Sequence, residues 1–223
     1  MVQNNGFSVE IIPVDGQVSD FDRGGAEYVG LNNNTEYKIK LSNQRDTICD
    51  VDLDLEGKHI GKWRINAHDS IVIERPANIS QKFTFFSETS MRADEAGVNV
   101  GGRNNGLLKA TFYPKKTYRE EPVLVQESIS YRSSMASSAT QSMRRSSPRG
   151  FKSGVTLLGD YSDQEFGTTR PLRDNEIDWS DKTTIYLRLV VRKSQPIHYR
   201  QIENAYPRRI EDTYPRRIES YRY

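Results

Sequence analysis

Three alternating carboxylates are the most suggestive chemical feature of the sequence. Asp50, Asp52 and Asp54 stand at every second position, as the first ligands of a helix-loop-helix calcium loop do. Such a loop also needs a glutamate at its twelfth position, where this chain has Gly61. We therefore expect an acidic strand face exposed to solvent and no metal. A docking surface for basic peptides is the alternative.

Glycines cluster between residues 97 and 106, which end in Gly-Gly-Arg-Asn-Asn-Gly. The backbone amides of such a loop can approach an anion, so residues 97–106 are a candidate cradle for a small ligand. No Gly-Lys-Ser or Gly-Lys-Thr ending is present, and the pattern predicts a following strand where nucleotide motifs require a helix. A flexible surface loop is the favoured interpretation. A hydrolase or a carbohydrate binder that uses this loop is the alternative function.

The histidines and the single cysteine form no local catalytic motif. His59, His68 and His198 lie far apart in the sequence, and no Gly-x-Ser-x-Gly elbow surrounds a serine. Cys49 stands on the apolar side of an alternating run, which indicates a buried thiol. We predict no catalytic residue, metal or cofactor, and the sequence favours a non-catalytic role over an enzyme.

A basic segment rich in serine and arginine spans residues 128–153. It has too few apolar residues to offset the entropic cost of ordering the chain, which is about 1 to 2 kcal/mol per residue. We therefore predict a disordered insertion. Ser146 and Ser147 follow two arginines and precede a proline. This context makes both serines candidate phosphorylation sites.

The C-terminal stretch repeats every eight residues around the core Arg-x-Ile-Glu, which occurs three times. One isoleucine per octad cannot form a core, so the repeat predicts a flexible tail of linear motifs that dock partner proteins. Contact with RNA or another polyanion is the alternative, although residues 198–223 hold six arginines against four acidic residues. The residues predicted to bind a partner are Ile202, Tyr206, Arg208, Arg209, Ile210, Tyr214, Arg216, Arg217 and Ile218.

Short β-strands are predicted to position these residues. Residues 49–55 and 59–65 alternate and should form a hairpin that turns at Glu56-Gly57, with Trp63 anchoring the core. Residues 82–86 are aromatic on both faces, which is typical of a central strand. Residues 17–25 read as loop. Further strands are expected at 7–12, 27–31, 35–41, 71–74, 107–113, 155–158 and 183–192, with one helical turn at 90–96.

Short strands separated by Gly, Pro and Asn turns predict an all-β fold, an antiparallel β-sandwich of jelly-roll type. We assign residues 1–118 to the sandwich core and 119–154 to the disordered insertion. Residues 155–193 are too few to hold a core alone and should complete the same sandwich. Residues 194–223 form the predicted tail.

Composition limits the expected partners and compartment. The 32 Lys and Arg residues nearly balance the 30 Asp and Glu residues, so the chain as a whole has no charge that predicts a nucleic-acid or membrane partner. No long apolar run and no apolar leader are present, and a lone cysteine suits a reducing compartment. We therefore expect an intracellular, cytoplasmic protein.

Four stretches between residues 26 and 116 carry a family resemblance. They are Gly57-Lys58-x-Ile60-Gly61-x-Trp63-Arg64-Ile65, Ile73-Glu74-Arg75-Pro76, Phe83-Thr84-Phe85-Phe86, and Asn105-Gly106-Leu107-Leu108 leading to Phe112-Tyr113-Pro114. Together they resemble small uncharacterised β-sandwich proteins of large nucleocytoplasmic DNA viruses and some protists. The resemblance implies a structural, virion-associated role within a larger assembly, and it implies no known site.

Overall fold

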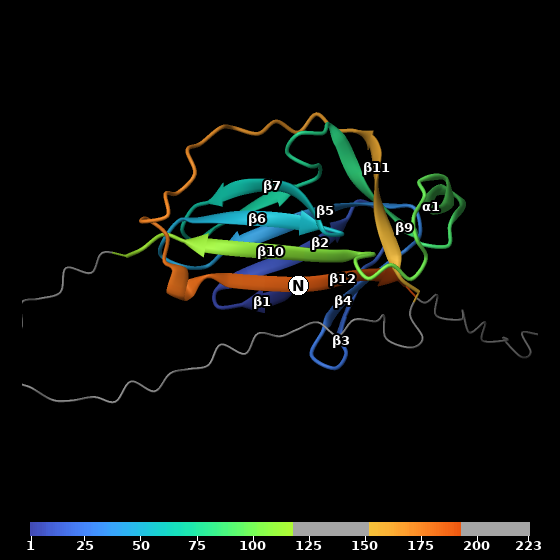
Figure 1. Cartoon of the computed structure of the whole chain (residues 1–223), viewed down its shortest axis with the longest axis horizontal. Coiled ribbons are helices and arrows are strands. Elements are labelled where there is room, and N and C mark those ends of the chain that lie inside the picture. Colours follow the sequence, from blue (N-terminus) through green and yellow to red (C-terminus); the bar gives the residue numbers. More distant parts are fainter. Residues whose placement is uncertain (118–151, 193–223) are drawn as a thin grey trace, which may run out of the picture. The chain divides into compact units, whose positions relative to one another are not determined.

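The structure is a computed structural model that describes residues 1–117 and 152–192. Its described part is nearly all β, with two sheets of mainly antiparallel strands, so the all-β prediction is confirmed (Figure 1). The candidate phosphosites Ser146 and Ser147, the whole octad repeat and its predicted partner-binding residues lie outside the described residues.

The first sheet has the strand order β1-β2-β5-β9-β11. An additional strand, β8, pairs with the second half of β5, while β9 pairs with its first half. The bounds are β1 Val2–Asn4, β2 Phe7–Pro13, β5 Thr35–Asn43, β8 Asp69–Ile73, β9 Gln81–Ser87 and β11 Gly154–Tyr161. As predicted for residues 82–86, β9 lies between two neighbours and is buried on both faces.

The second sheet has the order β3-β4-β12-β10-β6-β7. Its strands are β3 Ser19–Asp22, β4 Glu27–Leu31, β12 Thr183–Val191, β10 Leu107–Pro114, β6 Cys49–Leu55 and β7 Lys58–Ile65. All described pairs are antiparallel except β4 with β12, which run parallel. The late strand β12 therefore lies between two strands that come from the first half of the chain.

The hairpin of β6 and β7 forms where the sequence predicts it. Glu56 and Gly57 have φ angles of 55° and 80°, the left-handed values that two-residue hairpin turns require. Alternation along β6 then buries Val51, Leu53 and Leu55 on one face, and Asp52 and Asp54 lie half-buried on the other. One irregularity at Ile60 shifts the register between the two strands.

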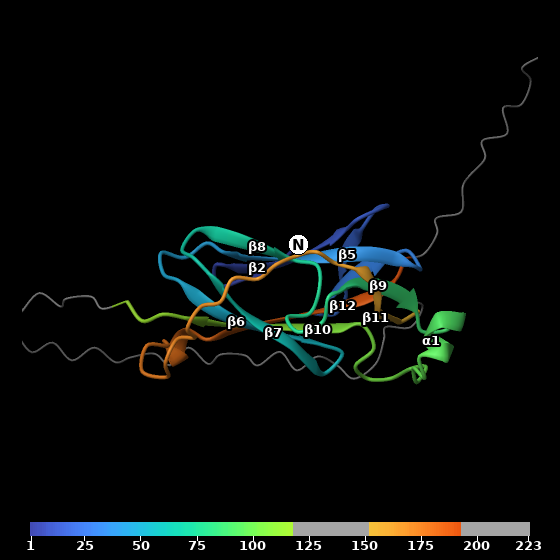
Figure 2. The same ribbon diagram turned by 90° about the horizontal axis from the view of Figure 1, so that it is seen from above.

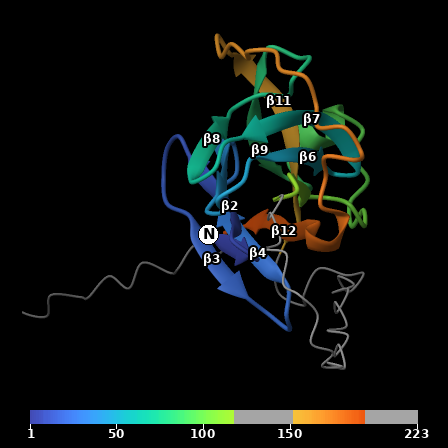
Figure 3. The same cartoon turned by 90° about the vertical axis from the view of Figure 1, so that its left-hand side faces the viewer.

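Both sheets contribute to one hydrophobic core. Ile39 and Phe85 from the first sheet and Leu187 from the second belong to the same buried cluster. The rings of Phe7 and Phe112 stack across the two sheets with centroids 4.6 Å apart. The sheets therefore pack face to face, an arrangement that Figure 3 shows end-on.

Two local expectations are wrong and one is confirmed. Residues 17–25 contain β3, because the tight turn at Arg23 returns the chain onto β4, with the amide of Arg23 donating to the Ala26 carbonyl at 3.0 Å. Trp63 does not anchor the core; it is half-buried and packs against the edge of the core. The predicted helical turn is present as α1 (Met91–Glu95), with Ser90 as its N-cap.

An irregular connection, which we call the strap, covers residues 162–173 between β11 and the short 3-10 helix η1 (Trp179–Asp181). It contains no strand or helix. Figures 1 and 2 show it running along the side of the molecule where β7 and β8 lie. The strap thus follows the open side between the two sheets.

Candidate functional site

Each carboxylate of the acidic row on β6 lies beside a cation, and the first of the three is buried. Asp50 is only 2% exposed, and its Oδ1 contacts Nε and Nη2 of Arg64 at 2.8 and 2.7 Å. Its Oδ2 accepts a hydrogen bond from the amide of Leu172 at 2.7 Å. Strap and hairpin therefore share one buried carboxylate, which corrects the expectation of solvent exposure for Asp50.

The other two carboxylates of the row are partly exposed. Lys62 Nζ lies 3.5 Å from Asp52, and Lys109 Nζ lies 2.9 Å from Asp54. Burial opposes ionisation of Asp54, but the hydrogen bond and charge of Lys109 lower the pKa of this carboxyl below its ordinary value. Within residues 1–117 and 152–192, no group of three or more His, Cys, Asp and Glu side chains is arranged to hold a metal ion.

The glycine-rich loop 97–106 is held by hydrogen bonds to the rest of the body. Glu88 Oε2 accepts from the amide of Gly101 at 3.0 Å and from the side-chain amide of Asn105 at 2.9 Å. The buried guanidinium of Arg188 donates to two carbonyl oxygens of the loop at 2.8 and 2.9 Å. Several polar groups of the loop are therefore already engaged within the protein.

The histidines and the cysteine lie apart. His59 lies 3.3 Å from Asp54, and His68 lies 2.7 Å from Asp46 at another surface position. His198 is outside the described residues. Cys49 is buried as predicted, and burial raises the pKa of its thiol to about 12, so the nucleophilic thiolate is suppressed.

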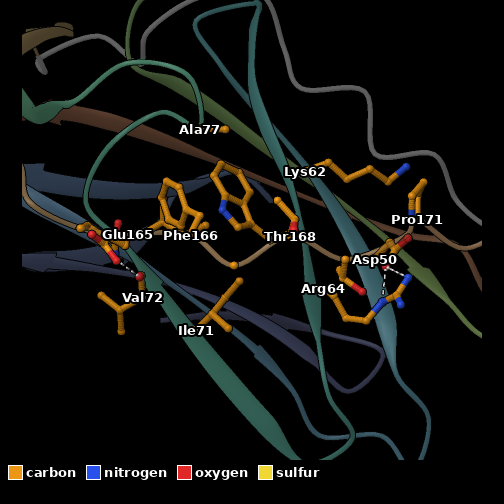
Figure 4. A pocket seen from close by; sticks show the side chains of 15 residues that line it. Asp50, Lys62, Arg64, Ile71, Val72, Ala77, Glu165, Phe166, Thr168 and Pro171 are labelled. Atoms are coloured by element: carbon orange, nitrogen blue, oxygen red, sulfur yellow. Dashed lines mark hydrogen bonds and ion pairs between the residues drawn. The ribbon is translucent and has the colours of Figure 1, made fainter.

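A pocket that sequence reasoning missed lies between β7, β8 and the strap (Figure 4). We call it the edge slot. Its volume is about 830 Å³. The apolar side chains that line it are Trp63, Ile71, Val72, Ile73, Ala77, Phe166 and Pro171.

The strap is fastened to β8 by Gln164, whose side-chain amide replaces a neighbouring strand. Its Oε1 accepts from the amide of Glu74 at 3.0 Å, and its Nε2 donates to the carbonyl of Val72 at 2.7 Å. The hydroxyl of Ser162 also donates to the buried carboxylate of Glu74 at 2.6 Å. This end of the strap therefore covers the edge of β8 at Val72 and Glu74.

Phe166 enters the slot from the strap. Its ring meets the ring of Trp63 edge-on, with centroids 5.7 Å apart, and the guanidinium of Arg75 lies 4.4 Å from the centre of the Phe166 ring. Arg75 Nε also donates to the carbonyl of Gln164 at 2.8 Å. These contacts position one aromatic wall of the slot.

The two long sides of the slot retain backbone groups that the protein does not pair. Among the described residues, the backbone of 165–171 makes no hydrogen bond. The next backbone hydrogen bond of the strap is the one that the amide of Leu172 donates to Asp50. β7 is the edge strand of its sheet. Apart from its pairing with β6, the carbonyl of Ile60 accepts a backbone hydrogen bond from the amide of Ala77 at 2.9 Å. The slot can therefore offer both donors and acceptors.

Comparison with family models, with curated proteins and with solved structures gives no match. In the ranges that the structure describes, no helix has the length and apolar character needed to cross a membrane. The function is therefore inferred from the chain's own geometry and sequence.

Proposed function

We propose that the chain is a non-catalytic structural or protein-interaction module of jelly-roll type, which docks partner proteins in a larger assembly through its C-terminal octads. The observation that carries the proposal is the use of the acidic row. Its carboxylates, the best chemical candidates of the sequence, serve as ion-pair partners between neighbouring strands. A virion is the assembly that the family resemblance implies.

The points at which the two appended segments join the body support this function. The amide of Val191 donates to the carbonyl of Lys152 at 2.9 Å, so Lys152 and Arg192 lie at the same end of β12. The Ser/Arg segment therefore re-enters the body close to the place where the chain leaves it toward the octads. One partner could contact both segments, and phosphorylation of Ser146 or Ser147 would change the charge it meets.

Each octad offers one apolar side chain between opposite charges. The isoleucine of Arg-x-Ile-Glu would enter a pocket of the partner, and the flanking arginine and glutamate would set the register by charge complementarity. Three linked copies would raise the overall affinity by effective concentration, on the order of 10²-fold, where the partner has repeated sites.

The proposal predicts that changing Ile202, Ile210 and Ile218 together to Ala abolishes co-purification of partners, while every charge is kept. Deletion of residues 198–223 should have the same effect, and the midpoint of thermal unfolding should stay at the parent value. Affinity capture followed by mass spectrometry measures the first outcome, and calorimetry measures the second.

A matched variant separates protein docking from polyanion binding. In it, the octad arginines become glutamine and the isoleucines stay. If this variant loses binding, the triple isoleucine variant keeps it, and the parent complex weakens steeply with salt, the ligand is RNA or another polyanion and the docking proposal fails.

A further inference from the structure

We propose that the edge slot is a second interaction site, which binds an extended segment of another polypeptide by adding it as a strand beside β7. This site belongs to the folded body. It goes beyond the octad tail and can be tested separately from it, because the residues that form it, Asp50 on β6 and the others within 60–77 and 164–172, all lie outside the octads.

The strand β7 lies at the edge of the second sheet, and most of that edge is open. An edge strand presents a row of unpaired amides and carbonyls, which proteins cover, blunt or use for strand addition. On the neighbouring edge, the side chain of Gln164 covers β8 at Val72 and Glu74. On β7, the described chain supplies one backbone bond, at Ile60, and residues 62–64 line the slot. The strap thus covers part of the β8 edge, whereas most of the β7 edge has no backbone partner beyond β6 among the described residues.

The strap forms the side of the slot opposite β7. It is anchored at Gln164 and Leu172, and the backbone between them is extended over the slot without a partner in the described chain. Phe166 packs into the slot, but the next residue, Gly167, is exposed and has open space where a Cβ would stand. A peptide in the slot would therefore find backbone groups on two sides.

The residues that line the slot indicate which side chains an occupant should have. Trp63 and Phe166 form an aromatic corner of a slot that Ile71 also lines, which suits one branched aliphatic side chain. In Figure 4, Glu165 and Lys62 lie at opposite ends of the slot. Asp50 and Arg64 neutralise each other, and an acidic residue of the occupant would share Lys62 with Asp52, which lies 3.5 Å from its Nζ. The occupant that fits is an extended segment with a central branched residue, a basic residue toward Glu165 and an acidic residue toward Lys62.

The test uses the full chain with Trp179→Phe, which leaves Trp63 as the sole tryptophan because the sequence has two, so that its emission can be excited selectively over that of the tyrosines. The probe is the capped hexapeptide Thr-Arg-Thr-Ile-Thr-Glu, in which the charged and apolar side chains share one face of a strand. We expect a saturable change in Trp63 emission. The same peptide with every backbone amide N-methylated keeps all side chains but has no backbone donor on either edge, and we expect it to bind at least about tenfold more weakly.

Protein variants locate the site. Phe166→Ala should weaken probe binding about fivefold or more. Thr168→Pro, at an exposed strap residue that lines the slot, removes a backbone amide that no described residue pairs and should weaken binding as well. Leu158→Ala, on the exposed edge of β11, is the matched control and should bind like the parent. Thermal unfolding of each variant shows whether it is folded.

Three results would overturn the slot proposal. They are no saturable signal at millimolar probe, equal binding of the N-methylated peptide, or a loss with Leu158→Ala as large as that with Phe166→Ala. The triple octad isoleucine variant should bind the probe like the parent. Failure of the slot and failure of the tail proposal are thereby distinguished.

Discussion

At the scale of single residues, Glu56 connects the two sheets. It sits in the turn between β6 and β7, and its Oε1 accepts from the amide of Thr156 on β11 at 2.6 Å and from the amide of Gly106 at 3.2 Å. Thr156 in turn pairs with the buried hydroxyl of Tyr37 at 2.7 Å. Burial of the Glu56 carboxyl outweighs the two hydrogen bonds and raises its pKa to about 7.

This raised pKa predicts a pH effect on stability. A carboxyl whose pKa is higher in the folded chain binds its proton more tightly there, so its contribution is complete below pH 4.5, the ordinary value, and is lost as pH rises through about 7. Glu56→Gln keeps an acceptor without the charge. We expect the variant to match the parent near pH 4.5 and to exceed it by up to about 3 kcal/mol at pH 8.

Urea unfolding at several pH values measures the difference between parent and Glu56→Gln. The difference curve cancels the opposite effect of groups such as Asp54, whose lowered pKa adds stability above its own range. A flat difference between pH 4.5 and 8 would show that Glu56 titrates at its ordinary pKa.

Two acids of the same row should differ in their contribution to stability. Asp50 is buried with Arg64 and also holds Leu172, whereas the side chain of Asp52 is 27% exposed beside Lys62. Asp50→Ala removes the carboxylate that pairs the half-buried Arg64 guanidinium and the Leu172 amide, and should cost about 3 kcal/mol of unfolding free energy. Asp52→Ala should cost less than about 1 kcal/mol.

Denaturant unfolding of Asp50→Ala and Asp52→Ala at neutral pH provides the comparison. Equal losses for the two variants would contradict the assignment of Asp50 as the shared anchor of hairpin and strap. A double-mutant cycle of Asp50 with Arg64 isolates the pair from the contact to the strap.

At the scale of elements, alternation is what made the strands predictable. Cys49–Leu55 and Leu107–Pro114 each place their buried residues with a period of two, and flanking Gly or Pro marks their ends. β3 was missed because it is a short strand of alternating exposure with a single large apolar residue, Phe21. β3 forms a strand because it pairs with β4, although its composition alone does not predict one.

The edge slot could not be predicted, because the strap has no local period. Its anchors are single side chains whose partners lie far away in sequence, Gln164 on β8 and Leu172 on Asp50, at separations of 92 and 122 residues. The same long-range contact makes Asp50 buried, so the error about the acidic row and the missed slot have one cause. A half-buried aromatic on an edge strand, Trp63, was the available signal.

At the scale of the whole molecule, β12 should be indispensable for the body. It pairs with β10 on one side and with β4 on the other, so its removal would divide the second sheet into two pieces and expose core residues such as Leu108. A chain that ends at residue 182 should therefore show no cooperative thermal unfolding. Adding a synthetic peptide of residues 183–192 should restore part of the transition.

Calorimetry and near-ultraviolet circular dichroism measure that loss and its recovery. A chain that ends at residue 192 is the matched control, because it lacks the same octads but keeps β12. If the chain that ends at 182 melts as cooperatively as this control, β12 is an accessory strand.

The position of β12 also has a consequence during synthesis of the chain on the ribosome. Strands β4 and β10 emerge first and must wait, with one edge each unpaired, until residues 183–191 have been translated. The octads are translated only afterwards. An incomplete chain that stops before β12 therefore carries no octad, so nascent fragments that cannot close the second sheet also lack the segment that would recruit them into an assembly.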